Sequence, residues 1–206
     1  MGYSGGQETM EGGVISHPWL PFLPEHTQVL FLGSFPPDPK RWCMDFFYPN
    51  FINDMWRIFG LCLYGDSNYY VDVENRVFRH QMIVREMTSL GVGFYDTALK
   101  VRRLRDTASD KDLEVVCPTD LDALLGAAPG LRAVVTTGQK ATDIVTRHFD
   151  IVPPKMGEGV PFSFQQRPLM LYRMPSSSRA YPMKLAQKAA YYQTIFDLYI
   201  NQHYTT

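Results

Sequence analysis

The chain has 206 residues, of which 45% are hydrophobic, so it is long and apolar enough to bury the core of one domain. Its formal net charge of −1 argues against a protein that coats nucleic acid regardless of sequence or lesion, because such proteins carry a strong basic excess. Its three cysteines are widely spaced and form no CxxC pair, which indicates neither a disulfide framework nor a zinc site and favours the reducing cytoplasm.

The first 13 residues hold five glycines and few apolar side chains, a composition typical of a disordered leader. We therefore expect a single α/β domain over residues 14–206. The start lacks the basic stretch followed by an apolar stretch that a secretory signal requires, and no apolar run approaches the ~18 residues of a membrane span. We expect a cytoplasmic monomer without a membrane partner.

Strand-like and helix-like patterns alternate along the rest of the chain, after an apolar, proline-broken arm at residues 17–24. Apolar runs that end in turn residues predict four strands, at about residues 29–33, 91–97, 132–138 and 168–174. Helical spacing of apolar residues predicts helices over about residues 53–61, 78–90, 120–128, 139–149 and 183–199. The alternation predicts βα units, and therefore a mainly parallel sheet with helices on both faces.

Glycines and charged residues predict where these elements stop. Gly60 and Gly65 are expected to end the first helix, and Gly91 the second. A stretch rich in Arg and Asp, at residues 100–116, is expected to be a polar loop.

Polar or turn-forming residues lie at the carboxyl end of each of the four predicted strands. They are Gly33 and Ser34, Asp96 and Thr97, residues 137–140, and residues 175–178. Ligands of open parallel sheets bind outside the carboxyl ends of the strands. The sequence therefore predicts a site at this edge of the sheet.

The first of these loops has two interpretations, which both stay open. Gly33 to Pro37 form either a tight turn or a rigid loop that presents backbone N–H groups to a ligand, since glycine permits close approach and proline restricts motion. In the second interpretation Gly33, Ser34 and Phe35 contact the ligand.

An aromatic segment at residues 46–56 is open to two interpretations as well. Phe46, Phe51 and Trp56 are expected in the core, but Asn50 and Asn53 need hydrogen-bonding partners or water if they are buried. Aromatic rings beside carboxamides are what a base pocket requires, because the ring stacks on the base and the amide pairs with its edge. Phe47, Tyr48 and Asn50 are therefore candidate base-binding residues.

The loop after the fourth strand contains three consecutive serines. These residues either cap the last helix or hold a phosphate backbone through hydroxyl and amide groups. The candidate DNA-binding residues here are Ser176, Ser177, Ser178, Arg179 and Tyr181. Lys100, Arg102, Arg103 and Arg105 form either a solvated loop or a second phosphate-binding edge.

Several common chemistries lack their motifs in this sequence. The five histidines have no metal-ligand spacing, and no GxSxG, GxxxxGK[ST] or GxGxxG motif is present. We therefore expect no metal, no cofactor and no serine nucleophile.

Taken in order, the motifs resemble the uracil-DNA glycosylase superfamily, and most of all its hypoxanthine-DNA glycosylase-like branch. They are residues 33–36 after a strand, Asn53 three residues before Trp56, residues 93–97, and residues 175–178 after a strand. The resemblance spans roughly residues 27–200. It implies a three-layer α/β/α domain with a four-stranded, mainly parallel central sheet and an active site at the strand ends.

The resemblance also implies a catalytic residue. Phe35 and Pro36 stand where several branches carry a side chain that positions water, and Met174 stands where a histidine often precedes Pro-Ser. In the hypoxanthine-like branch an asparagine before the tryptophan takes the role, which in this chain is Asn53.

The expected function is that of a monofunctional, metal-independent DNA glycosylase, which flips a deaminated base of the uracil or hypoxanthine class out of DNA and hydrolyses its N-glycosidic bond. Its expected partner is DNA that contains a damaged base. Two alternatives use the same pocket: a non-catalytic binder of damaged or single-stranded DNA, and a protein that binds a nucleoside or nucleotide.

Overall fold

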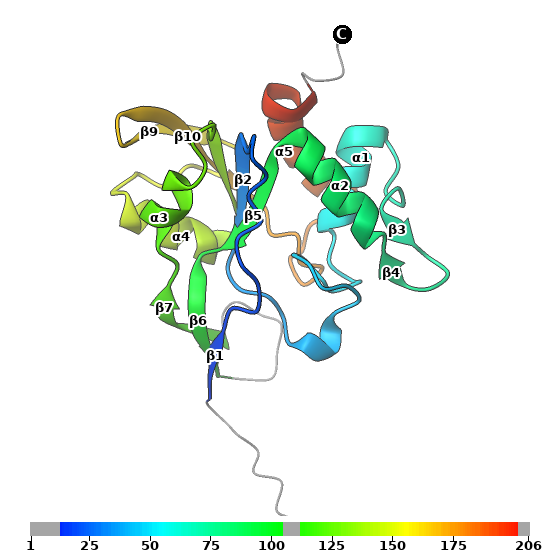
Figure 1. Ribbon diagram of the computed structural model, residues 1–206. Helices are drawn as coiled ribbons and strands as arrows, with labels where there is room; N and C mark the ends of the chain where they lie inside the picture. Colours follow the sequence, from blue (N-terminus) through cyan, green and yellow to red (C-terminus); the bar gives the residue numbers. More distant parts are fainter. Residues whose placement is uncertain (1–12, 105–111, 202–206) are drawn as a thin grey trace, which may run out of the picture.

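The computed structural model of the protein describes residues 13–104 and 112–201 (Figure 1). The predicted leader lies outside the described residues except for Gly13, and so does Arg105. Among the described helices, none is both long enough and apolar enough to cross a membrane.

The main sheet contains five strands in the order β5-β2-β8-β10-β9, and four of them run parallel. These four are the predicted strands: β2 (Val29–Gly33), β5 (Val92–Asp96), β8 (Ala133–Thr137) and β10 (Arg167–Met174). Every residue of β2, β5 and β8 is buried, as expected for strands covered on both faces, which explains why each of them begins with residues that are not charged or strongly polar.

The fifth strand, β9 (Gly159–Phe164), makes the expected count of four wrong. It forms an antiparallel hairpin with β10 across Gln165 and Gln166, whose φ angles are 50° and 64°. A two-residue turn of this kind usually carries asparagine or glycine. Two glutamines at these positions therefore do not predict a hairpin. Pro161 also disguises the strand, although proline is tolerated at a sheet edge.

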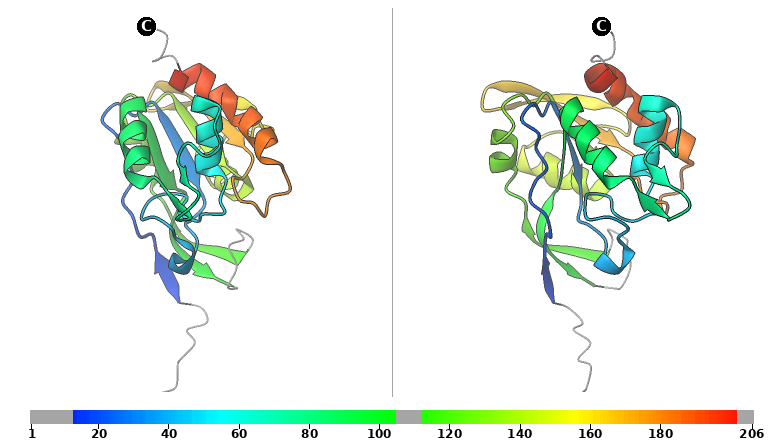
Figure 2. Two further views of the ribbon diagram at one scale, coloured as in Figure 1. Left: turned by 90° about the vertical axis from the view of Figure 1, so that its right-hand side faces the viewer. Right: turned by 45° about the vertical axis from the view of Figure 1, so that its right-hand side comes forward.

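The helices lie on both sides of this sheet. Figure 2 shows α1 between α2 and α5 on one face, and Figure 1 shows α3 and α4 on the other side. Their bounds are α1 (Met55–Tyr64), α2 (His80–Leu90), α3 (Leu121–Gly126), α4 (Gln139–His148) and α5 (Leu185–Ile195), and a π-helical turn (Phe196–Ile200) follows α5. From β2 to β5 the chain crosses the sheet in one direction, and from β5 to β8 it crosses in the opposite direction. Because such crossovers are right-handed, the helices of the two connections lie on opposite faces of the sheet.

Two glycines end helices as expected and one does not. Gly65 closes α1 and Gly91 closes α2, both in the left-handed region at φ 67° and 64°. Gly60 lies inside α1, so the expectation that it breaks the helix is wrong. A Cβ at position 60 would lie 2.3 Å from the Asp66 carbonyl oxygen, so glycine lets the returning chain pack against the helix.

The expectation of a polar loop at residues 100–116 is also wrong, because most of the described residues in this stretch belong to a second sheet. This antiparallel sheet has the order β1-β6-β7, with strands β1 (Val14–Ser16), β6 (Ala98–Arg103) and β7 (Leu113–Pro118). It buries Ala98, Val101 and Leu113 between exposed charged residues. Figure 1 shows it beyond the carboxyl ends of β2 and β5. Arg103, Leu113, Val115 and Pro118 of this sheet line the cleft described below.

A small hairpin joins the first two helices. It consists of β3 (Val71–Asp72) and β4 (Val77–Phe78).

Candidate active site

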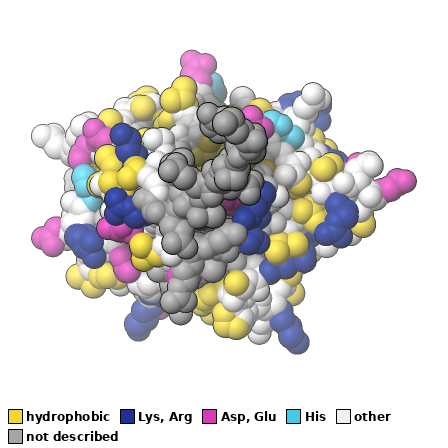
Figure 3. Space-filling view, turned by 90° about the horizontal axis from the view of Figure 1, so that it is seen from below, with side chains coloured by type: hydrophobic (Ala, Val, Ile, Leu, Met, Phe, Trp, Pro, Cys, Tyr) yellow, Lys and Arg dark blue, Asp and Glu magenta, His cyan; other side chains and the backbone are white. Residues whose placement is uncertain are grey.

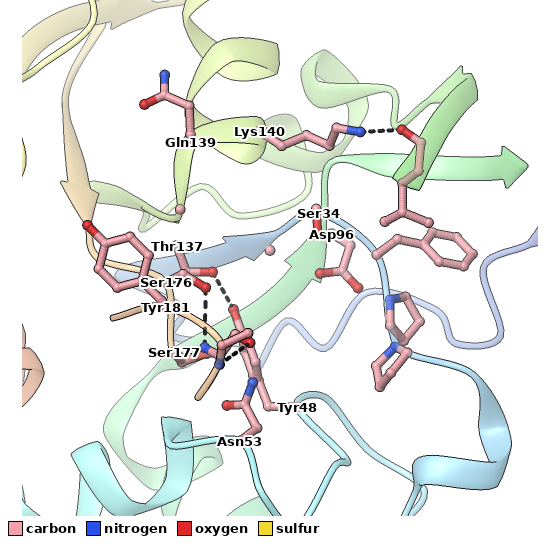
Figure 4. A pocket seen from close by; sticks show the side chains of 18 of the residues that line it. Ser34, Tyr48, Asn53, Asp96, Thr137, Gln139, Lys140, Ser176, Ser177 and Tyr181 are labelled. Carbon is pink, nitrogen blue, oxygen red and sulfur yellow. Dashed lines mark hydrogen bonds between the residues drawn. The ribbon is translucent and has the colours of Figure 1, made fainter. Parts of the chain in front are cut away.

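A cleft of about 1370 Å³ opens at the carboxyl ends of the parallel strands. Its lining includes Gly33 at the end of β2 and Ser34 after it, Asp96 at the end of β5, Gly138 after β8, and residues 175–178 after β10. All four strand ends singled out in the sequence therefore meet at one cavity. Figure 4 shows Ser34, Asp96, Thr137 and Ser176 around it.

The structure brings nearly all the predicted site residues to this cleft. Those that line it are Gly33, Ser34, Phe35, Tyr48, Asn50, Asn53, Ser176, Ser177, Ser178, Arg179 and Tyr181. Phe47 does not line it. Its side chain is 3% exposed and packs between the rings of Trp19 and Phe94, so it belongs to the core and presents no face to a ligand in the cleft.

The floor of the cleft is a close contact between two neighbouring strands. Gly33 pairs with Asp96 in the sheet, and a Cβ at position 33 would lie 2.4 Å from Asp96 Oδ1. Glycine is required here because the carboxylate occupies the space of a side chain. Asp96 is 6% exposed, so its charge is held in a largely desolvated position.

A residue of the N-terminal arm approaches this carboxylate from behind. His17 Nε2 lies 2.9 Å from Asp96 Oδ2, and the side chain of His17 is fully buried. No sequence pattern marks this pair, apart from one polar residue in an otherwise apolar arm. Burial, and then the nearby Asp96 carboxylate, raises the pKa of Tyr95, whose ring packs against His17.

Tyr48 crosses the cleft between two strand ends. Its hydroxyl lies 3.0 Å from Thr137 Oγ1 and would be 3.4 Å from a Cβ at Gly33. Its φ of 52° is unusual for a bulky residue, and such conformations persist only where the surrounding contacts enforce them. The fold therefore holds one half-buried aromatic ring in a fixed place beside the Gly33 loop.

Both asparagines of the aromatic segment stabilise local turns. The Asn53 Oδ1 atom accepts a hydrogen bond from the Met55 N–H at 2.9 Å, at the start of α1. The Asn50 Oδ1 atom accepts one from the Ile52 N–H at 3.2 Å. Each carbonyl oxygen has two lone pairs, so each can still accept a second hydrogen bond from the cleft.

The serine loop is fastened to the aromatic segment by an ionic cluster that we call the Asp54 clamp, formed by Asp54, Arg179 and Lys188. Lys188 Nζ donates to Asp54 Oδ2 at 2.9 Å and to the Ser178 carbonyl at 2.7 Å. Arg179 Nε donates to Asp54 Oδ1 at 3.0 Å. The Asp54 N–H donates to the Ser177 carbonyl at 2.9 Å. Lys188 is fully buried, and the helical spacing of its neighbours gave no reason to separate it from the solvent-facing lysines.

The serines themselves shape the loop. Ser176 Oγ accepts from the Ser178 N–H, and Ser178 Oγ accepts from the Ala180 N–H, each at 3.2 Å. These hydroxyls form local turns, so the predicted cap for the last helix lies elsewhere: Gln187 Oε1 accepts from the Lys184 N–H at 3.2 Å.

The cleft is basic, although the whole chain is not. Its lining contains six Lys or Arg side chains against two Asp: Arg41, Arg103, Lys140, Arg147, Arg173 and Arg179 against Asp96 and Asp143. Figure 3, a view from below, shows Lys and Arg side chains on both sides of the centre of this face.

Of the three residues of the predicted basic cluster that the structure describes, one joins this lining. Arg103 lines the cleft and donates to the Pro36 carbonyl. Arg102 pairs with Glu114 at 2.7 Å, and Lys100 is exposed outside the cleft. Across residues 13–104 and 112–201, no three His, Cys, Asp or Glu side chains group as a metal site would.

Comparison with known proteins defines the class of fold. No protein-family model and no curated protein sequence matches the chain. Among solved structures it is similar to the solution NMR structure of a "putative Uracil DNA glycosylase" from Methanosarcina acetivorans, with a TM-score of 0.57. The two chains are 20% identical, and the similarity covers 89% of this chain and 97% of the other. The fold is therefore that of this archaeal protein.

Proposed function

We propose that the protein belongs to the uracil-DNA glycosylase superfamily and excises a deaminated base from DNA. The observation that carries the proposal is the strand-end cleft, which combines a fixed aromatic ring, a buried carboxylate and a basic lining in the fold of the archaeal protein. The proposed enzyme is monofunctional and uses neither a metal nor a lysine nucleophile, and the hypoxanthine-like branch remains the proposed relationship.

The proposed base pocket lies between Gly33, Tyr48 and Asp96. Tyr48 takes the stacking role, since Phe47 is buried, and stacking on an aromatic ring contributes roughly 1–3 kcal/mol per base. That energy offsets the few kcal/mol needed to flip a base, a cost that is lowest for a mispaired base. The backbone around Ser34 and Phe35 is proposed to face the leaving base and to stabilise its negative charge.

Asp96 explains why a deaminated base would fit. An ionised carboxylate only accepts hydrogen bonds. Deamination changes N3 of cytosine and N1 of adenine from acceptors into N–H donors, as uracil and hypoxanthine form. Asp96 lines the cleft and its Oδ1 atom lies next to Gly33, so one acceptor oxygen there would favour both products over both parent bases.

Asn53 is proposed to orient the attacking water. A carboxamide is too weak a base to deprotonate water, so the reaction would depend on departure of the base before water attacks the sugar. Positive charge then develops on the sugar and negative charge on the leaving base, which the backbone around Ser34 and Phe35 would stabilise. The serine loop, with Arg179 and Tyr181, would hold the flipped strand by its phosphates.

Base release tests the proposal directly. The protein is incubated with duplexes that contain uracil, hypoxanthine or xanthine, and alkali-labile abasic sites are measured. We expect cleavage of at least one of these duplexes and none of undamaged DNA. Binding without cleavage would indicate a non-catalytic binder, and stabilisation by free nucleotides alone would indicate a nucleotide-binding protein.

Replacing Asn53 with alanine tests the catalytic assignment. The expected effect is a loss of tenfold or more in the rate of base release, because a positioned catalytic group typically contributes about 10²–10⁴-fold. Loss of the turn bond to Met55 costs only about 1 kcal/mol of stability, as for a helix cap. Asn68→Ala, at an exposed site away from the cleft, is the control. An unchanged rate of base release in Asn53→Ala would mean that another residue orients the attacking water.

Neutralising a cleft cation tests the DNA contact. Arg147→Gln is expected to weaken binding of damaged and undamaged duplexes alike and to reduce the slope of log K against log salt by about one, because one phosphate contact is lost. The matched control is Arg85→Gln, at an exposed position on α2 outside the cleft. If the slope of log K against log salt is the same for Arg147→Gln and Arg85→Gln, the DNA does not contact this side of the cleft.

A further inference from the structure

The N-terminal arm inserts a buried histidine behind the proposed base pocket. The arm enters as strand β1, and the backbone N–H of Phe22 donates to the carbonyl of Phe94 in β5 at 3.0 Å. His17 lies between these two attachment points, and its ring packs against the rings of Phe35 and Tyr95. These neighbours fix the ring plane, so the direction of its two nitrogen atoms is set by packing.

The hydrogen bonds of His17 define which nitrogen carries a proton. Nε2 lies 2.9 Å from Asp96 Oδ2, and a carboxylate oxygen can only accept, so Nε2–H is the donor. Nδ1 lies 2.9 Å from the Trp19 carbonyl and 3.2 Å from the Trp19 N–H. Trp19 can therefore bond either the neutral or the protonated ring. In both states His17 donates to Asp96.

This donor occupies one oxygen of Asp96 and leaves the other for the cleft. Oδ2 is bonded to His17, while Oδ1 lies over Gly33. Among the residues that the structure describes, His17 is the one side chain that makes an ion pair with Asp96. An Asp side chain has only two torsions, so fixing Oδ2 also fixes Oδ1.

We propose that His17 is a positioning residue of the active site: its hydrogen bond to Oδ2 holds the Asp96 side chain with a single oxygen, Oδ1, presented to the flipped base. This inference rests on the proposed glycosylase function. It makes the arm part of the recognition machinery and gives it a role beyond packing. Without His17 the carboxylate can rotate, so Oδ1 loses its fixed position and no longer selects an N–H donor at one place on the base.

Two substitutions separate this role from packing. His17→Phe fills the same space among the aromatic rings but has no donor, whereas His17→Gln retains an N–H that can reach Asp96. We expect His17→Phe to release the lesion base about tenfold or more slowly, since small misplacements in a site have effects of this size, and to lose discrimination against undamaged DNA. His17→Gln should recover most of the rate. His26→Ala, at an exposed position of the same N-terminal segment, should match the wild type.

A double-mutant cycle tests whether His17 acts through Asp96. In an Asp96→Ala background the carboxylate is absent, so adding His17→Phe should change base release by less than about twofold. If the double variant instead loses activity by the product of the two single-variant factors, the two residues act independently. That result would indicate a purely structural role of His17 and overturn the inference. Melting temperatures of all variants are measured alongside, and discrimination against undamaged DNA is compared at equal folded fraction.

The same variants distinguish failure of this inference from failure of the proposed function. Base release by the wild type tests the function alone. If the wild type releases no base, the variants are compared for binding of a duplex with 2′-fluoro-2′-deoxyuridine, whose glycosidic bond resists cleavage. Weaker lesion binding by His17→Phe and recovery in His17→Gln would support the positioning role. Equal affinity of His17→Phe and the wild type would overturn it.

Discussion

Replacing Asp54 with alanine is expected to lower the free energy of unfolding by about 3–5 kcal/mol, because it leaves the fully buried Lys188 ammonium without its counter-ion. Asp54 joins the start of α1 to the serine loop and to α5, so the loss should also free the serine loop. Denaturant unfolding measures the stability. DNA affinity at matched salt measures the effect on the loop, and we expect it to fall as well.

The two basic partners of Asp54 provide the control. Arg179 is 48% exposed, so Arg179→Ala should cost about 1 kcal/mol or less, as exposed ion pairs do. Asp54→Ala combined with Lys188→Met removes both buried charges and should recover much of the lost stability. Equal small losses in Asp54→Ala and Arg179→Ala would show that the buried pair contributes little.

Gly33→Ala is expected to reduce base release about 100-fold, because reacting groups displaced by about 1 Å lose rates of this order. The new Cβ would lie 2.4 Å from Asp96 Oδ1, and His17 holds the same carboxylate from the other side. Either the carboxylate or the strand must shift. Overpacking of this kind also costs about 1–3 kcal/mol of stability.

Gly126→Ala is the matched control, since no atom lies within 4 Å of its added Cβ and it ends a helix. It should leave base release unchanged and stability unchanged or slightly higher. In an Asp96→Ala background, Gly33→Ala should destabilise far less, because the clashing oxygen is gone. Wild-type rates in Gly33→Ala would show that Asp96 can move aside without consequence.

The sequence predicts the parallel strands well because they are buried on both faces. Val29 to Leu32 and Ala133 to Val135 are continuous apolar runs, and Gly33 and Gly138 mark their ends. Since the carboxyl ends of parallel strands share one edge, the position of the site can also be predicted. The β9 and β6–β7 segments are less predictable, because their strands are partly exposed and their sequences contain proline or charge.

The chemistry of the site is only partly predictable from sequence. Tyr48 and the serine loop can be chosen as candidates from the residue types around them. Phe47, which precedes Tyr48, lies in the same aromatic segment but faces the core. The roles of Asp54 and His17 depend on ion pairs with Lys188, 134 residues away, and with Asp96, 79 residues away. No local sequence pattern therefore marks either residue. Long-range ion pairs of this kind require the fold before they can be recognised.

The Asp54 clamp also bears on the order in which the molecule matures. Lys188 lies on the last α-helix, and its bond to Asp54 joins residues 134 positions apart. Such distant contacts form late, because the chain must close a long loop before it gains their energy. A chain in which α5 has not yet packed against α1 therefore lacks the contact that fastens the serine loop. Ordering of this loop would follow the docking of α5.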